Sequence, residues 1–385
     1  MSGHQKNGPS TDPTKFEDPK GPGQAELEGY RVEIDGLDNQ IIGLLNKRAA
    51  VAQDVGRIKA AYSQRAYAPE RERQLLGRLL DSNPGPLPND GLRMIYKEII
   101  SACLSLESPL KVAYLGPAGT FTHTATKSHF GLSAQLLAKQ TISDIFDDVE
   151  RGRAEFGVVP IENSTEGVVN HTLDAFMASR LSICAEVLLQ VNHHLLTLTG
   201  DMEAVTKVYS HTQALAQCRK WLEHNMPGIA LIEVSSTARA AQLASEDPSA
   251  AAVASDLAAS VHGLQIAHSR VEDLEGNMTR FLVIGDREME PTEDDRTSIM
   301  FSLRDCPGVL YDALFPFASS GINLSRIESR PSRQRAWEYL FFIDLVGHKA
   351  DEQVSVAIEK LKETCVFIRV LGSYPRGGLL EGPLS

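Results

Sequence analysis

The sequence predicts a multidomain protein in which an all-α segment, an α/β segment and a small α+β segment follow one another along the chain. Three observations carry this prediction. Apolar residues recur at helical spacing over 26–108, short apolar strands alternate with helices over 110–286, and a compact strand and helix pattern fills 297–375. The length of 385 residues also favours two or three domains.

The composition excludes several classes of protein. Hydrophobic residues make up 42% of the chain and charged residues 23%, which supplies several cores and excludes a largely disordered chain. The formal net charge of -12 disfavours a general nucleic-acid binder. No apolar run approaches the roughly 20 residues of a membrane span.

The composition of the N-terminus and the spacing of the cysteines indicate the cellular compartment. Residues 1–25 are rich in Gly, Pro and Lys, and they lack the apolar centre of a signal peptide, so we expect a disordered leader. The 5 cysteines are scattered without a CxxC pair, which favours neither a disulfide framework nor a zinc cage. These features predict a cytoplasmic protein.

The first segment is predicted to form three helices. Apolar spacing predicts one helix of about 35 residues from Glu26 to Tyr62, a length unusual for a globular domain. Shorter helices are predicted from Pro69 to Asp81 and from Asp90 to Leu106. Because these helices bury little surface alone, we expect a dimer or packing against the rest of the chain.

Cations in this segment have a spacing that could form a site. Arg48 and Lys59 are 11 residues apart, so they share a helix face about 16 Å apart along the axis. Arg31 lies about 100° away from that face, so it would join the same site from a second copy of the helix. Cys103 and Glu107 are four residues apart on the third helix. On spacing alone, a solvated charged helix face is the favoured explanation.

The motifs Arg31-x-x-Ile-Asp-x-Leu-Asp, Leu44-Leu-x-x-Arg, Val55-Gly-x-x-Lys and Arg71-Glu resemble the all-helical chorismate mutases. That family forms an intertwined dimer in which each active site takes an arginine from the partner. The resemblance implies that Arg31 of a second copy, Arg48 and Lys59 bind the two carboxylates and the ether oxygen of chorismate. It also implies that Glu72 binds the substrate hydroxyl, with Arg71 and Cys103 nearby.

Three positions depart from the common pattern of that family. Ala68 stands where an Asp is often found, Cys103 replaces a Ser, and Glu107 replaces a Gln that donates to the ether oxygen. An ionised Glu cannot donate a hydrogen bond. We therefore predict that Glu107 is held protonated, so that mutase activity is favoured at lower pH and Glu107→Gln flattens this dependence.

In the α/β segment, several strands lead into turns rich in hydroxyl groups and small residues, namely Gly116–Thr122, Glu162–Gly167, Ser210–Thr212 and Ser235–Thr237. Free backbone N–H groups at helix N-termini bind carboxylates, and ligands of α/β sheets lie at the carboxyl ends of strands. Four such turns together would bind a small organic acid. Taken singly, each turn is better explained as an ordinary helix cap.

Four motifs in this segment resemble prephenate dehydratases: Gly116-Pro-x-Gly-Thr-Phe, Val159-Pro-Ile-Glu-Asn-Ser, Tyr209-Ser-His and Asn277-x-Thr-Arg-Phe. The resemblance implies two α/β lobes with a cleft between them, similar to periplasmic binding proteins. The lobes would span about 110–188 with 271–285, and 189–270. It also implies that Thr279 is the essential catalytic residue.

The dehydration expels a ring hydroxyl with loss of CO2, and that hydroxyl needs a proton or a hydrogen bond to leave. A free threonine is too weak an acid, so we expect Thr279 to donate a hydrogen bond or to relay a proton. Which group supplies the proton stays open. Thr279 and Phe281 share one side of their strand, and Arg280 faces the other. The expected surrounding residues are Thr120, Glu162, Asn163, Ser164, Thr165, Ser210, His211 and Phe281.

The pair His193-His194 raises the question of a metal site. Neighbouring residues in a strand point to opposite faces, and no HExxH motif follows. Ordinary packing or surface placement is therefore favoured for both histidines.

The last segment has the order βαββαβ, which is the ferredoxin-like arrangement, and residues after Pro375 are expected to be loose. Its Pro-Gly-Val-Leu, Gly-Ile-Asn and Glu-Ser-Arg-Pro stretches, following a dehydratase, resemble the ACT regulatory domain. The resemblance implies that L-phenylalanine binds between paired subunits. The residues implied are Gly308, Val309, Leu310, Asn323, Glu328 and Ser329. A module that only dimerises is the alternative.

Together, these resemblances cover residues 26 to 375, and they imply a bifunctional chorismate mutase and prephenate dehydratase of phenylalanine biosynthesis. The enzyme would be inhibited by phenylalanine, form a homodimer or larger oligomer, and need no cofactor, metal, nucleic acid or membrane. Two alternatives stay open: a dehydratase whose helical domain is silenced, and a non-catalytic sensor of aromatic acids. Arogenate is an alternative substrate to prephenate.

Overall fold

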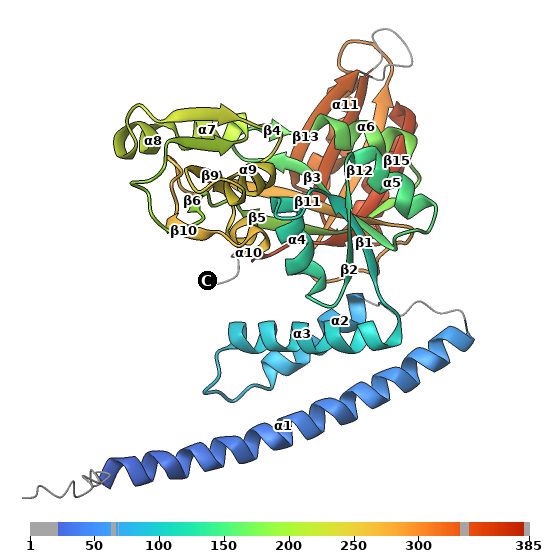
Figure 1. The fold of residues 1–385 in the computed structure, drawn as a ribbon. Helices are drawn as coiled ribbons and strands as arrows, with labels where there is room; N and C mark the ends of the chain where they lie inside the picture. The colour runs from blue at the N-terminus through green and yellow to red at the C-terminus, as the bar shows by residue number, and fades with distance from the viewer. Residues whose placement is uncertain (1–21, 63–66, 68, 332–338, 381–385) are drawn as a thin grey trace, which may run out of the picture.

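The computed structural model describes residues 22–62, 67, 69–331 and 339–380. Residues 1–21 of the predicted leader, and Ala68, lie outside the described residues, whereas residues 22–25 belong to the first helix. Figure 1 shows a helical region, two α/β lobes and a C-terminal sheet domain. The predicted fold class is confirmed in each part.

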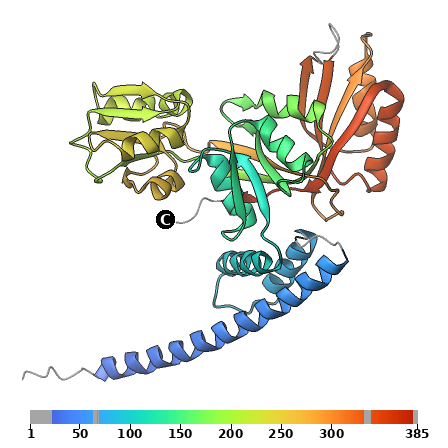
Figure 2. The ribbon, with the colours of Figure 1, turned by 45° about the vertical axis from the view of Figure 1, so that its right-hand side comes forward.

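The helical region consists of α1 (Pro22–Ala61), α2 (Pro69–Asp81) and α3 (Asn89–Glu107). Helix α1 packs against α3 near Gly56, where an added Cβ would lie 2.9 Å from Cβ of Glu107. The N-terminal end of α1 extends beyond α2 and α3 (Figures 1 and 2). Apolar side chains such as Ile34 and Ile41 are exposed along it. The helix therefore presents an apolar face that the described part of the chain leaves uncovered.

Lobe one is built on a seven-stranded sheet in the order β16-β5-β11-β3-β1-β2, with β4 paired to β3. Its strands are β1 (Lys111–Leu115), β2 (Gln135–Lys139), β3 (Phe156–Asn163), β4 (Gly167–Val168), β5 (Ser182–Gln190), β11 (Met278–Gly285) and β16 (Leu379–Leu380). Helices α4 (Phe121–Phe130), α5 (Ile142–Glu150) and α6 (Asn170–Ala178) belong to the same lobe. The tail after Pro375 was expected to be loose, but its strand β16 pairs with β5, which corrects that expectation.

Lobe two is built on a five-stranded sheet in the order β10-β6-β9-β7-β8. Its strands are β6 (His194–Thr197), β7 (Lys207–Ser210), β8 (Ala230–Glu233), β9 (Ala250–Ala254) and β10 (Gln265–His268). Its helices are α7 (Thr212–Gln217), α8 (Arg219–Asn225), α9 (Thr237–Ser245) and α10 (Asp256–His262). The chain enters this lobe after β5 and returns to lobe one through β11, which inserts antiparallel between β5 and β3. The segment that returns from lobe two and leads into β11 is called the second crossing. Its residues lie where the two lobes meet.

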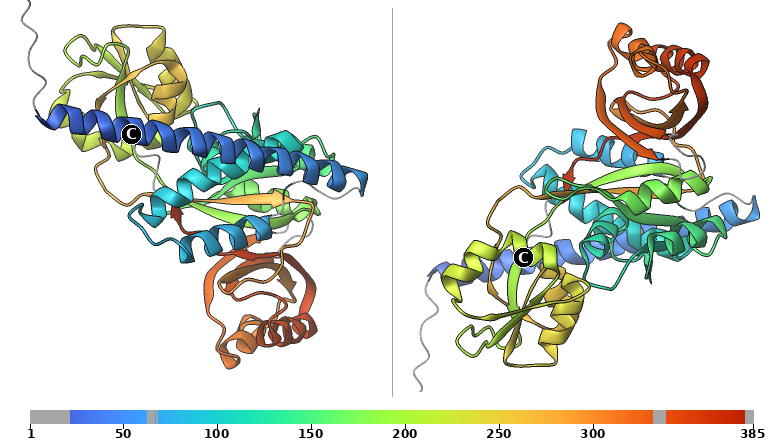
Figure 3. Two further views of the ribbon diagram at one scale, coloured as in Figure 1. Left: turned by 90° about the horizontal axis from the view of Figure 1, so that it is seen from below. Right: turned by 90° about the horizontal axis from the view of Figure 1, so that it is seen from above.

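The C-terminal domain has the predicted βαββαβ order: β12 (Asp295–Leu303), α11 (Val309–Ser319), β13 (Leu324–Pro331), β14 (Tyr339–Val346), α12 (Glu352–Thr364) and β15 (Cys365–Pro375). The antiparallel sheet has the order β13-β14-β12-β15. Its core joins that of lobe one, because Met300, Phe342 and Tyr374 share a buried cluster with Ile183 and Leu282. Lobe two and the C-terminal domain lie at opposite ends of lobe one (Figure 3).

Candidate functional site

A cleft of about 690 Å³ separates the two lobes, and residues from both lobes line it. Lobe one and the second crossing contribute Thr120, Phe121, Asn163, Asn277, Thr279 and Phe281. Lobe two contributes His193, His211, Gln217, Ser235, Ser236 and Thr237. The side chains of Thr120 and Ser236 cap the N-termini of α4 and α9, so two helix starts face the same space. A helix N-terminus attracts a carboxylate, which suits an organic acid.

Thr279 is held by Asn163 at the floor of this cleft. The Nδ2 group of Asn163 donates to Oγ1 of Thr279 over 2.8 Å. The orientation of this amide is fixed, because its Oδ1 accepts the backbone N–H groups of Thr165 and Glu166 at 2.9 and 3.0 Å. Since Thr279 accepts the bond from Asn163, its own hydroxyl proton is available to a group in the cleft.

Asn277 joins the two lobes beside Thr279. Its Oδ1 accepts from Nδ2 of Asn163 at 2.9 Å and from the hydroxyl of Thr165 at 3.1 Å. Its Nδ2 donates to Oε1 of Gln217, in lobe two, over 3.0 Å. Asn277 belongs to the dehydratase-like motif but had no predicted role, and its position two residues before Thr279 was the available signal. Gln217 had no signal in the sequence.

His193 extends the same network. Its Nε2 lies 3.0 Å from Oε1 of Gln217, an oxygen that only accepts, so Nε2 carries the hydrogen. Burial lowers the pKa of His193 despite this bond, which favours the neutral ring. The predicted ordinary packing is confirmed in that His193 is buried, yet it also lines the cleft.

Four predicted residues take other positions. Glu162 was expected at the substrate, but it points to the opposite face of the sheet and pairs with Arg326 at 3.5 Å. Ser210 was expected there too, but it is buried and donates to the carbonyl of Val253 over 2.6 Å. Ser164 and Thr165 contact Asn277 instead of lining the cleft. The residues that do line it are Thr120, Asn163, His211, Thr279 and Phe281.

A second cavity of about 340 Å³ lies among the three N-terminal helices. The predicted residues Arg48, Lys59, Arg71, Glu72, Cys103 and Glu107 all line it. The ammonium group of Lys59 lies 3.2 Å from Oε2 of Glu107, and both side chains are mostly buried. Burial raises the pKa of Glu72, while Lys97 and Arg73 act against that shift. Cations and carboxylates thus face one cavity.

Arg31 lies away from this cavity. It is 17 residues before Arg48 on the continuous helix α1, which corresponds to about 26 Å along the axis. Its guanidinium is exposed and pairs with Glu28 at 3.3 Å. Within one chain Arg31 cannot reach a ligand in the cavity, so its predicted role requires a second copy.

In the C-terminal domain, the predicted ligand residues fall into separate groups. Gly308 has a φ of 84° and precedes Val309 at the start of α11, where Leu310 is 37% exposed. Asn323 follows the other end of that helix, which is about 16 Å long. Glu328 and Ser329 lie on β13 with alternating exposure. One chain does not bring Gly308 and Asn323 together, so a site using both needs paired chains.

Among the described residues, no helix has the length and apolar character of a membrane span.

Comparisons with known proteins match all three parts of the chain. Residues 30–108 match the family model for chorismate mutase type II, residues 112–289 that for prephenate dehydratase, and residues 297–363 that for the ACT domain. The chain is 50% identical over 360 residues to the bifunctional chorismate mutase/prephenate dehydratase of Aquifex aeolicus, covering 92% of this chain and 99% of that one. The enzyme of the same description from Pseudomonas aeruginosa is 46% identical over 362 residues, covering 92% and 99%.

A solved structure is also similar. The prephenate dehydratase of Arthrobacter aurescens in complex with L-Phe is 36% identical, with a TM-score of 0.65. The match covers 69% of this chain and 90% of that one.

Proposed function

The chain belongs to the family of bifunctional chorismate mutase/prephenate dehydratases, and from this premise we propose how its own residues carry out the two reactions. The protein is an enzyme of phenylalanine biosynthesis that has both activities. This membership speaks against a non-catalytic sensor and against a dehydratase with a silent helical domain.

Dehydration takes place in the cleft between the lobes, with Thr279 acting on the leaving hydroxyl. The bond between the ring and its carboxylate breaks to release CO2, and its electron pair completes the aromatic ring. The bond between the ring and its hydroxyl breaks at the same time, and that oxygen leaves as water with one proton. The observation that carries this role is the bond from Asn163, which leaves the Thr279 proton free to assist the departing oxygen.

The remaining groups of the cleft bind the rest of the substrate. The N-termini of α4 and α9, capped by Thr120 and Ser236, suit the carboxylate of the pyruvyl side chain. Phe281, on the same face of β11 as Thr279, offers an apolar surface to the ring. His211 caps α7 on the opposite wall.

The mutase reaction takes place in the helical cavity. The rearrangement of chorismate is pericyclic, so the site needs only to fold the dianion and stabilise charge on its ether oxygen. Arg48 and Lys59 supply cations, and Arg31 supplies another from a second copy. Glu72 accepts the substrate hydroxyl. Glu107 lies 3.2 Å from the ammonium group of Lys59, beside the proposed position of the ether oxygen.

Two features support a homodimer or larger oligomer. The apolar face of α1 is exposed in one chain, and the mutase site lacks Arg31 without a second copy. The phenylalanine site would likewise combine Gly308, Val309 and Leu310 of one chain with Asn323 of its partner, beside Glu328 and Ser329. The relative solved with L-Phe supports phenylalanine as the ligand and inhibitor.

The experiment is a comparison of Thr279→Val and Thr279→Ser with prephenate as substrate. Valine has nearly the same shape but lacks the hydroxyl, so we expect a kcat loss of about 10²- to 10⁴-fold, with partial rescue by serine. Chorismate turnover by the same samples checks folding. Full dehydratase activity of Thr279→Val would contradict the role of this hydroxyl. Parallel assays with arogenate decide between the two dehydratase substrates.

A further inference from the structure

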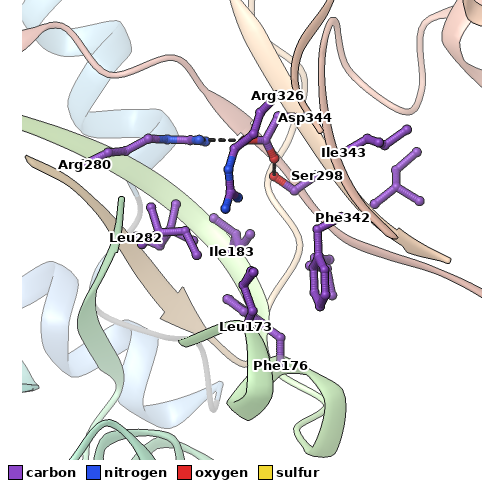
Figure 4. Close-up of a pocket in the computed structure, with 13 residues that line it drawn as sticks. Leu173, Phe176, Ile183, Arg280, Leu282, Ser298, Arg326, Phe342, Ile343 and Asp344 are labelled. Atoms are coloured by element: carbon purple, nitrogen blue, oxygen red, sulfur yellow. Dashed lines mark hydrogen bonds and ion pairs between the residues drawn. The ribbon is translucent and has the colours of Figure 1, made fainter. Parts of the chain in front are cut away.

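The side of the sheet opposite the cleft carries a buried charge cluster that joins lobe one to the C-terminal domain. Arg280 follows Thr279 on β11 and points away from the cleft. Its guanidinium bonds to Glu186 at 2.7 Å, to Asp344 at 2.6 Å and to the hydroxyl of Tyr374 at 2.9 Å. Glu186 belongs to lobe one, whereas Asp344 and Tyr374 belong to the C-terminal sheet. Figure 4 shows Arg280 aimed at Asp344 across this boundary.

A second arginine, Arg326 on β13, completes the cluster. Arg326 pairs across the strands with Asp344, and its Nε lies 3.5 Å from Oε2 of Glu162 in lobe one. Its side chain is only 10% exposed, and its Nε and Nη2 have no hydrogen-bond partner within the described part of the chain. Burial opposes ionisation of Asp344, but Arg280 and Arg326 hold the pKa of this carboxyl below its usual range. The carboxylate of Asp344 thus bonds to Arg280 and also feels the charge of Arg326.

The register of β11 and β3 places this cluster directly behind the catalytic residues. Thr279 pairs with Asn163, and the next pair is Arg280 with Glu162. Because side chains alternate along a strand, the first pair faces the cleft and the second faces the C-terminal domain. A displacement of Arg280 or Glu162 therefore moves the backbone that carries Thr279 or Asn163.

The contacts that Arg280 and Glu162 make with the C-terminal domain differ in strength. The buried guanidinium of Arg280 makes three short hydrogen bonds, and these hold its side chain in place. The pair of Glu162 and Arg326 is longer, at 3.5 Å, and Glu162 is 40% exposed. Strand β13 also carries Glu328 and Ser329, two and three residues beyond Arg326, where the proposed phenylalanine site lies. A ligand that shifts β13 would act on this looser contact first.

We propose that Glu162 and Arg280 are positioning residues of the dehydratase, which hold Asn163 and Thr279 from behind through Arg326 and Asp344 of the C-terminal domain. Arg280 fixes β11 in place. The contact between Glu162 and Arg326 transmits the state of β13 to the catalytic pair, so phenylalanine changes the rate through it. This inference rests on the proposed role of Thr279 and on the proposed phenylalanine site.

The test is a double-mutant cycle of Glu162→Gln and Arg326→Gln in the full chain. Each single variant is expected to lower kcat for prephenate by about 3- to 10-fold, with KM within about twofold of wild type. The double variant should be no slower than the slower single variant, because both changes remove one contact. The phenylalanine concentration for half inhibition should rise more than the dissociation constant measured by equilibrium dialysis. Chorismate turnover should stay at the wild-type level.

Asp174→Asn is the matched control. It removes an ion pair of 2.9 Å between Arg330 of β13 and Asp174 of α6, at the same boundary but away from the catalytic strands. We expect it to leave kcat for prephenate and phenylalanine inhibition unchanged. Asp344→Asn weakens the anchor at Arg280, and it should lower kcat for prephenate while chorismate turnover continues.

Three results would overturn the proposal. The first is wild-type kcat and inhibition in both single variants. The second is an equal effect of Asp174→Asn, which would indicate general loosening of the boundary. The third is a strong effect of Glu162→Gln that Arg326→Gln does not share, because Glu162 would then act on substrate directly. Failure of the proposed function itself would be seen separately, as full dehydratase activity in Thr279→Val.

Discussion

The orientation of the Thr279 hydroxyl can be tested by Asn163→Asp. The wild-type amide donates from Nδ2 to Thr279 and Asn277 and accepts two backbone N–H bonds at Oδ1. A carboxylate of the same shape keeps the two backbone bonds, but it has no hydrogen to donate. The Thr279 hydroxyl would then turn and donate to that carboxylate.

The magnitude follows from the bond that must be broken before Thr279 can assist the substrate. A hydrogen bond to a charged group contributes about 1.5–3 kcal/mol, which corresponds to a loss of about 10- to 100-fold in kcat. Oδ1 of Asn277 also loses a donor, so the stability of this region should fall by about 1–3 kcal/mol.

The assay is prephenate turnover by wild type and Asn163→Asp, with chorismate turnover of the same samples as the check on folding. Asn225→Asp adds the same charge at an exposed position of α8 and should retain wild-type kcat. If Asn163→Asp keeps kcat within twofold of wild type, Asn163 does not direct the proton of Thr279, and the reasoning is refuted.

Three further predictions concern other parts of the chain. Glu107→Gln replaces a carboxylate beside Lys59 by an amide that can donate to the ether oxygen, so chorismate turnover should be retained, and its loss would contradict a donor at this position. Burial, with Lys97 and Arg73 nearby, lowers the pKa of His129 to about 3. The contribution of His129 to the free energy of unfolding is therefore fully present above pH 6.5, and it falls at lower pH because the histidine of the unfolded chain takes up a proton first. Wild type should therefore lose up to about 2 kcal/mol more than His129→Gln between pH 6.5 and 5, and equal losses in denaturant titrations would oppose this. Gly372→Ala places a Cβ against the carbonyl oxygen of Ile183 and 2.9 Å from its nitrogen, so melting temperature should drop by several degrees, whereas an unchanged value would show that β15 can shift.

The order of the domains was accessible from the sequence because each has its own hydrophobic period. The helical spacing, the alternating strands and helices, and the βαββαβ order all appear in the structure. The sequence did not predict strands β2, β4, β10 and β16. Strand β2 is only partly buried, so its apolar signal is weak, and β16 depends on a pairing with β5 that is distant in the sequence.

The candidate site was predicted only in part, because a motif does not show which way each side chain points. Asn163 and Glu162 are adjacent in one motif, yet the strand period separates them onto opposite faces. The alternation of side chains that places Arg280 on the face opposite Thr279 likewise places Glu162 on the face opposite Asn163. Ser210 lies away from the cleft because its hydroxyl donates to a buried carbonyl within lobe two. Gln217 enters the network only through the closeness of the two lobes, which no local pattern encodes.

The central claim is that the protein has two separate sites, with Thr279 serving only the second reaction. Its most direct test is to supply chorismate to purified Thr279→Val and to follow chorismate, prephenate and phenylpyruvate over time. We predict that chorismate disappears at the wild-type rate and that prephenate accumulates, with almost no phenylpyruvate. Formation of phenylpyruvate at the wild-type rate would contradict the account.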